Sequence, residues 1–175
     1  MISSLLLLTS LPQAAPTSVY VAPFTALDPA ADEIASQIPL VLVEHLKSVS
    51  SIDGRGLDQM DPVHDVPAAT YVATCPDTEY VGCAFVIGES SEMVYSVVGT
   101  VTPLEQGAMV KVHIIEISSA REALILDLQM AEGGEKEFAT AVARSLVGVA
   151  SGEIGQEEDL RVEEEEEGYN EAEAF

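Results

Sequence analysis

Positively charged side chains are scarce in this chain of 175 residues: 7 Lys and Arg stand against 30 Asp and Glu, for a formal net charge of -23. A nucleic-acid partner needs Lys and Arg to neutralise its phosphates, and anionic lipid attracts the same side chains, so this balance argues against both partners. Trp is absent and aromatic residues make up 5% of the chain, which argues against stacking platforms and aromatic cages. No run of about 18 apolar residues occurs, so we expect no transmembrane span in the mature chain.

Apolar material is nevertheless plentiful, since hydrophobic residues account for 47% of the chain. That share and that length support one ordinary folded domain with a real core. The acidic excess is steepest over 157–175, where ten acidic side chains and the single Arg161 give a net charge of -9. Because such a run repels itself and buries nothing, we expect 153–175 to be an acidic disordered tail. It serves either as an interaction or cation-binding tail, or only as a solvating one, as in general acidification for a salt-rich habitat.

The N-terminus has the pattern of an export signal. Residues 2–11 form an apolar stretch that is too short to span a bilayer, and the small residues Ala14 and Ala15 follow it. No Lys or Arg precedes Lys47, so the usual positive n-region is missing, and a short hydrophobic first strand is the alternative. The pattern predicts a signal peptide over 1–15 and a periplasmic or secreted mature protein.

Two cysteines fit an oxidising compartment. Cys75 and Cys83 are the only cysteines, and an even count in an exported chain favours a disulfide, with free buried thiols as the alternative. Closing so short a loop stabilises the folded state by about 2–3 kcal/mol in the chain-entropy model. Their spacing does not match a Cys-x-x-Cys redox site, and zinc needs two further ligands that the sequence does not offer at a suitable spacing.

Hydrophobic periodicity predicts an α/β (α+β) fold class with the order β-α-(β)-α-β-β-β-α. Asp28 followed by Pro29 is typical of a helix start, Pro39 lies inside the first helix and is expected to kink or restart it, and Gly152 favours a helix end after the last one. The doublet Ile114-Ile115 breaks a strand alternation and indicates a bulge. The predicted two-layer domain, 16–152, combines a mixed sheet of four to five strands with helices on one face. We expect strands over 18–24, 50–53, 93–101, 110–115 and 124–130, and helices over 28–49, 78–90 and 135–151.

Three of these segments resemble known bacterial envelope domains. The first strand reads Val-Tyr-Val-Ala-Pro-Phe over 19–24, a later one reads Tyr-Ser-Val-Val-Gly-Thr-Val over 95–101, and a hairpin follows over 110–125. The pattern is similar to the amino-terminal domain of the TolB translocation protein and to curli-secretion (CsgG-type) and FlgO-type envelope proteins. Ala120 stands where the hairpin of that family usually has Gly. The resemblance implies a non-catalytic envelope module that binds other proteins, and it supplies no catalytic residues.

The residues themselves offer one metal candidate. Asp58, Asp61, His64 and Asp65 provide three carboxylates and an imidazole within eight positions, which suits a divalent cation if a helix aligns them. Pro62 interrupts that alignment, and acidic residues are frequent throughout this chain, so chance clustering is the simpler reading. No nucleophile elbow, phosphate-binding loop, dinucleotide fingerprint or zinc-protease motif occurs, and no cofactor is expected.

The leading hypothesis is therefore an exported, non-catalytic protein-interaction module of the bacterial cell envelope, with envelope or secretion-system proteins as partners. Its expected contact surface is a sheet edge or the uncovered sheet face toward which Lys111 and His113 project. One alternative is a small acidic protein that binds a cation or ligand through residues 58–65 or the tail. The other is an enzyme of unrecognised type, which requires a pocket that joins His45, His64 or His113 to carboxylates.

Overall fold

The computed structural model describes residues 15–56 and 80–154. The order of elements within them follows the predicted one, with one very short extra strand near the N-terminus. The elements are β1 (Thr17–Val21), β2 (Thr25–Ala26), the short 3-10 helix η1 (Pro29–Ala31), α1 (Asp32–Lys47), β3 (Ile52–Arg55), α3 (Tyr80–Ser90), β4 (Tyr95–Pro103), β5 (Ala108–Glu116), β6 (Arg121–Met130) and α4 (Glu135–Ser151).

The strands form one mixed six-stranded sheet with the order β3-β1-β4-β5-β6. β1 runs parallel to both of its neighbours, β3 and β4, whereas β4, β5 and β6 form the predicted antiparallel meander. β2 pairs in parallel with β4 alone and so continues the path of β1 beyond Pro23. The α/β class and the mixed sheet are confirmed, and β2 adds a strand to the four or five that the sequence indicates.

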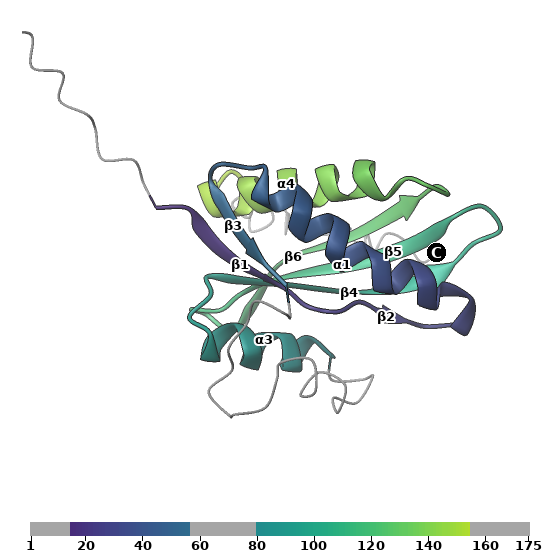
Figure 1. Ribbon diagram of the computed structural model, residues 1–175. Coiled ribbons are helices and arrows are strands. Elements are labelled where there is room, and N and C mark those ends of the chain that lie inside the picture. Colours follow the sequence, from purple (N-terminus) through teal and green to yellow (C-terminus); the bar gives the residue numbers. More distant parts are fainter. Residues whose placement is uncertain (1–14, 57–79, 155–175) are drawn as a thin grey trace, which may run out of the picture.

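Helices lie on both faces of this sheet (Figure 1). α1 and α4 cover one face and α3 packs against the other, whereas the sequence pattern placed the helices on one face. The strand order explains the difference. From β1 the chain crosses through α1 to β3 on one side, and from β3 it crosses back past β1 to β4 through α3. Parallel crossovers are right-handed. Because the second crossover runs across the sheet in the direction opposite to the first, its helix, α3, lies on the opposite face from α1.

The core accordingly has two parts. Val19 and Val21 point toward α1 and α4, and Tyr20 and Ala22 point toward α3, so β1 is buried on both faces. The larger part lies between the sheet, α1 and α4 and contains Ile38, Leu42, Leu46, Val142 and Leu146 among its fully buried side chains. The smaller part lies between the sheet and α3 and includes Ala84, Ile87, Val98 and Ile115.

Several local features match the sequence signals. The Asp28 side chain accepts a hydrogen bond from the Ala30 N–H (2.8 Å) and caps η1. Pro39 is an exception, because α1 continues through it from Asp32 to Lys47 and the expected alternative of a restart does not occur. The pairing of β5 with β6 shifts register between Ile114 and Ile115, which confirms the bulge. Gly152, in the left-handed conformation with φ 75°, ends α4 and donates its N–H to the Val149 carbonyl.

Candidate functional site

An apolar groove runs along α1 on the face of the sheet that α1 covers, with a volume of about 890 Å³. We call it the α1 groove. One wall is a face of α1 whose residues recur at spacings of three and four and include Pro39, Leu40 and Val43. Opposite them lie Phe24 and Ala26 of the segment that follows β1. Leu40 lines the groove with a side chain that is 70% exposed.

The groove exists because β3 is short. β3 pairs with β1 only as far as Arg55, opposite Tyr20, whereas the path of β1 continues through β2 to Ala26. Beyond Arg55 the described residues place no strand beside β2, and Gly56 lies at that end of the groove. Within 15–56 and 80–154, no residue fills the space beneath α1 that a longer β3 would occupy.

Phe24 forms the inner end of this wall, and two contacts hold it. Its ring meets the Phe138 ring of α4 edge-on, with centroids 6.4 Å apart. Gly99 of β4 lies directly behind it: a Cβ atom at residue 99 would lie 2.5 Å from Phe24 Cε1 and 2.4 Å from the Lys111 carbonyl oxygen. Only glycine leaves room for the ring in this position.

The charged groups of the groove lie at its ends, and the Ser36 hydroxyl lies between them. Asp32 is near the N-terminus of α1, and Glu44 and Lys47 are near its C-terminus. No histidine lines the groove: His45 is half-buried on another side of α1, and His113 lies on the opposite face of the sheet. The α1 groove thus does not join a histidine to carboxylates, as the enzyme hypothesis requires.

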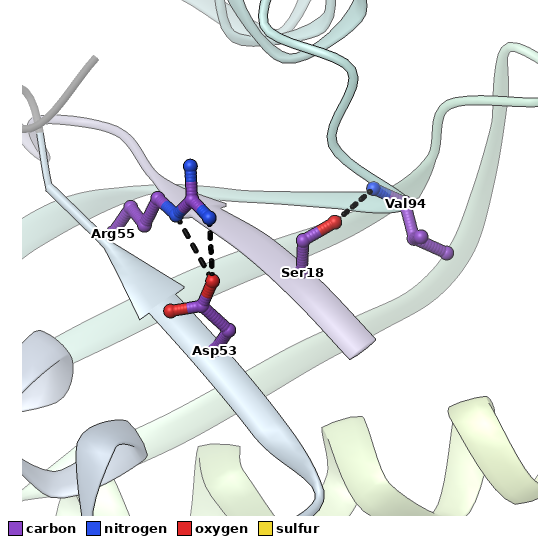
Figure 2. Close-up of polar contacts among 4 residues, drawn as sticks. All are labelled: Ser18, Asp53, Arg55 and Val94. Atoms are coloured by element: carbon purple, nitrogen blue, oxygen red, sulfur yellow. Dashed lines mark hydrogen bonds and ion pairs between the residues drawn. The ribbon is translucent and has the colours of Figure 1, made fainter. Parts of the chain in front are cut away.

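The outer strands of the sheet differ in how they present their edges. On β3, the Arg55 guanidinium donates from Nε and Nη2 to the same Asp53 carboxylate oxygen, at 3.0 Å and 2.7 Å, and these side chains lie on the face away from α1 (Figure 2). The Ser18 hydroxyl nearby accepts the Val94 N–H (3.2 Å) and ties β1 to the start of β4. β6 carries Arg121, Glu122 and Asp127, whereas β2 has no charged residue. Charged side chains on an edge strand oppose pairing with a further strand.

His113 is buried, although the sequence predicted that it would project from an uncovered sheet face. Lys111 stays half-exposed and lies 3.7 Å from Asp127, but His113 is only 8% exposed because α3 covers that part of the sheet. Its Nδ1 bonds the Glu122 carboxylate, and its Nε2 lies 3.4 Å from the Tyr80 hydroxyl of α3. His113 therefore joins α3 to β6. The prediction that His113 projects from an uncovered sheet face is wrong.

The other predicted site residues fall mostly outside the described ranges. Asp58, Asp61, His64 and Asp65 lie there, as does Cys75, while Cys83 is half-buried in α3. The Cys75–Cys83 disulfide, the metal candidate, the signal peptide over 1–15 and the disordered tail over 153–175 accordingly stay predictions. Within the ranges 15–56 and 80–154, no three His, Cys, Asp or Glu side chains gather closely enough to hold a metal ion.

Tyr20 is a large polar side chain at the centre of the smaller core. It is fully buried, and its hydroxyl has no hydrogen-bond partner among the described residues. Burial raises the pKa of its phenol well above the usual value, because the phenolate would lose its hydration. Burial, and to a lesser extent the Glu116 carboxylate, also raises the pKa of Tyr95. Neither phenol lies in the α1 groove, so neither contributes a reactive group to it.

No protein-family model matches the sequence, and no curated protein is similar to it. Solved structures do match. TolB from Acinetobacter baumannii aligns with a TM-score of 0.52 at 12% identity, over 81% of this chain and 29% of that chain. The PelC dodecamer from Paraburkholderia phytofirmans aligns at 0.45 and 14% identity, over 81% and 93%. The C-terminal domain of LpoB from Salmonella enterica aligns at 0.47 and 7% identity, over 69% and 87%.

The class that these observations define is a mixed α/β domain with helices on both faces of its sheet. Its fold is the one found in part of TolB, and the chain spans less than a third of the TolB structure that it matches. The predicted resemblance to TolB is thus confirmed for the fold, while that to CsgG-type and FlgO-type proteins stays a prediction. The helices of the described residues are all too short or too polar to cross a membrane.

Sequence reasoning missed the α1 groove, although a signal was present. The core stripe of α1 contains Ile38, Leu42 and Leu46, and it accounts for the predicted helix. Leu40 and Val43 are apolar residues outside that stripe, next to Pro39. A surface helix needs one apolar face for the core, so a second apolar face predicts a further contact surface.

Proposed function

We propose that this protein is an exported, non-catalytic interaction module of the bacterial cell envelope, and that it binds a partner protein through the α1 groove. The observation that carries the proposal is the groove itself: Pro39, Leu40 and Val43 of α1 lie beside β2, which has no charged residue and, among the described residues, no strand on its outer side. The TolB fold and the signal-peptide pattern over 1–15 support the envelope location.

Export has a direct test. Cell fractionation followed by a mass measurement without reductant reports the compartment, the cleavage near residues 14–15 and the Cys75–Cys83 disulfide together. We expect a periplasmic or secreted chain that has lost its leader and whose mass is two hydrogens below that of the reduced form. A full-length chain in the cytoplasm, with both thiols free, would rule out the envelope location.

The groove has a separate test with a matched control. Leu40→Glu places a carboxylate in the groove, whereas Leu27→Glu makes the same change at a leucine that is 62% exposed and does not line it. Both changes are at exposed positions, so both variants should fold with an unchanged Tm. After mild crosslinking in envelope extract, we expect the partner captured by the wild type to be retained by Leu27→Glu and lost by Leu40→Glu. Equal capture by the two variants would exclude the groove as the contact.

A further inference from the structure

Building on the proposed function, we propose that the partner segment in the α1 groove is an extended, uncharged or cationic peptide that adds a strand to the outer edge of β2. It occupies the place beside β2 that β3 does not reach. Its alternate side chains are apolar and enter the space beneath α1. This mode of binding, β-strand addition, combines backbone hydrogen bonds for affinity with side-chain pockets for specificity.

The backbone of β2 directs hydrogen-bonding groups toward its outer edge. The Leu27 N–H donates to the Val101 carbonyl (2.9 Å), so the Leu27 amide points toward β4. In a parallel ladder, successive residues direct their N–H and C=O groups to opposite sides, and those of Ala26 therefore point away from β4. β2 has no strand on that side among the described residues. The Ala26 side chain also lines the groove, so the open edge and the groove belong to one site.

The dimensions suit a short strand. α1 has 16 residues, which corresponds to a length of about 24 Å at 1.5 Å per residue. A strand that rises about 3.3 Å per residue spans this length with about seven residues. Because β2 has only two residues, its backbone pairs with only part of such a strand, and the remaining residues contact the groove through their side chains. Three or four of their side chains would point toward α1 and meet Phe24, Leu40 and Val43. Pro23 has no N–H to donate, so pairing begins after it.

Charge restricts the partner. The groove contains the carboxylates of Asp32 and Glu44 and the single ammonium group of Lys47, and the whole chain carries -23. An acidic peptide, or a second copy of this chain, would be repelled. The edges of β3 and β6 carry ionic side chains that oppose strand addition, so β2 is the favoured edge.

The proposal can be tested by selection from a random library of twelve-residue peptides displayed on phage, with the full chain as bait. We expect selected peptides to share apolar residues at every second position and a net positive charge. Binding of a selected peptide should weaken about tenfold or more in Leu40→Glu, because burial in the groove would leave the new carboxylate unpaired. In Leu27→Glu it should change less than about twofold.

Amide hydrogen exchange tests strand pairing independently. The Ala26 amide should exchange at least about tenfold more slowly in the complex with a selected peptide, because the peptide backbone accepts its hydrogen bond. The Leu27 amide already donates to Val101 and serves as the internal control. Glu44→Lys should weaken the binding of a cationic peptide at low salt, whereas Glu33→Lys, on α1 but outside the groove, should alter it much less.

The outcomes separate this inference from the proposed function. Peptides with apolar residues at spacings of three and four, sensitive to Leu40→Glu but without Ala26 protection, would indicate a helix in the groove and overturn strand addition only. A selected peptide that binds equally to Leu40→Glu and Leu27→Glu would overturn the groove as the site, and with it this inference. An envelope partner that Leu40→Glu still captures would contradict the proposed function even if peptides bind.

Discussion

Individual residues in this protein show where the fold tolerates an unfavourable group. Tyr20 is fully buried with an unpartnered hydroxyl, and Ala120 has a φ of 52° in the turn between β5 and β6. A buried hydroxyl without a partner costs about 1–3 kcal/mol, and a left-handed conformation costs a non-glycine residue about 1–2 kcal/mol. A single substitution at either position is therefore expected to stabilise the protein.

Tyr20→Phe should raise the free energy of unfolding by about 1 kcal/mol at neutral pH, since it removes the unpartnered hydroxyl and keeps the ring. It should also reduce the sensitivity to base. The phenol pKa is higher in the folded chain than in the unfolded chain, where it is about 10, so stability is fully present below pH 10 and is lost as the pH rises above it. Urea titrations at pH 7 and pH 10.5 measure both effects. A variant less stable than the wild type at pH 7 would mean that the hydroxyl has a partner.

Ala120→Gly should stabilise the protein by about 0.5–1 kcal/mol, because the relief of left-handed strain exceeds the added entropy of the unfolded chain. Ala150→Gly is the matched control: Ala150 is exposed in α4, where the same change should cost about 0.5–1 kcal/mol. Thermal unfolding of the two variants should shift Tm in opposite directions. Shifts in the same direction would show that the turn imposes no strain on Ala120.

At the scale of elements, Gly99 links β4 to the wall of the α1 groove. Gly99→Ala brings a methyl group against Phe24 and the Lys111 carbonyl, so we expect a loss of about 1–3 kcal/mol and a displaced Phe24 ring. Gly82→Ala lies within α3, and the new Cβ meets no described atom of another element within 4 Å, so this change should instead stabilise by up to about 1 kcal/mol. Chemical denaturation gives both values, and the aromatic proton shifts of Phe24 report its displacement. A neutral Gly99→Ala would contradict the tight packing behind Phe24.

Much of the element order was predictable, because the signals are local. Alternating residues define β4, β5 and β6, Asp28 and Pro29 define the helix start, and Gly152 defines the end of α4. The sheet face on which α3 packs was not predictable. The apolar residues of α3 form only a weak stripe, and the order of the strands decides which face the helix covers. The same limit applies to His113, whose alternation with Val112 and Ile114 indicates a more exposed face until α3 is known to cover it.

The candidate site was harder to predict from the sequence than the fold, because it depends on which segments lie side by side in space. The sequence predicts a short strand over 50–53, but it does not show that this strand pairs with β1 and ends opposite Tyr20 while the path of β1 continues to Ala26. The groove arises from that difference in strand length together with the second apolar face of α1. Leu40 could have been singled out as an apolar residue off the core stripe, but its neighbour across the groove, Phe24, could not.

At the scale of the whole molecule, charge and shape act together. A net charge of -23 keeps copies of the chain apart and favours cationic partners, while the α1 groove offers the apolar surface on which a neutral or basic segment can bind. The proposed contact surface thus lies on a strongly acidic chain. The acidic run after residue 157 is a second candidate for electrostatic contacts and stays a prediction.

The most direct test of the central claim is photo-crosslinking in living cells, with a photoreactive amino acid in place of Leu40 or, as the control, in place of Leu27. Both side chains are exposed, but only the first lies in the groove. The account predicts that the probe at residue 40 forms a discrete, light-dependent adduct with an envelope protein, whereas the probe at residue 27 forms none. Adducts of equal yield at both residues, or an adduct at residue 27 alone, would contradict binding through the α1 groove.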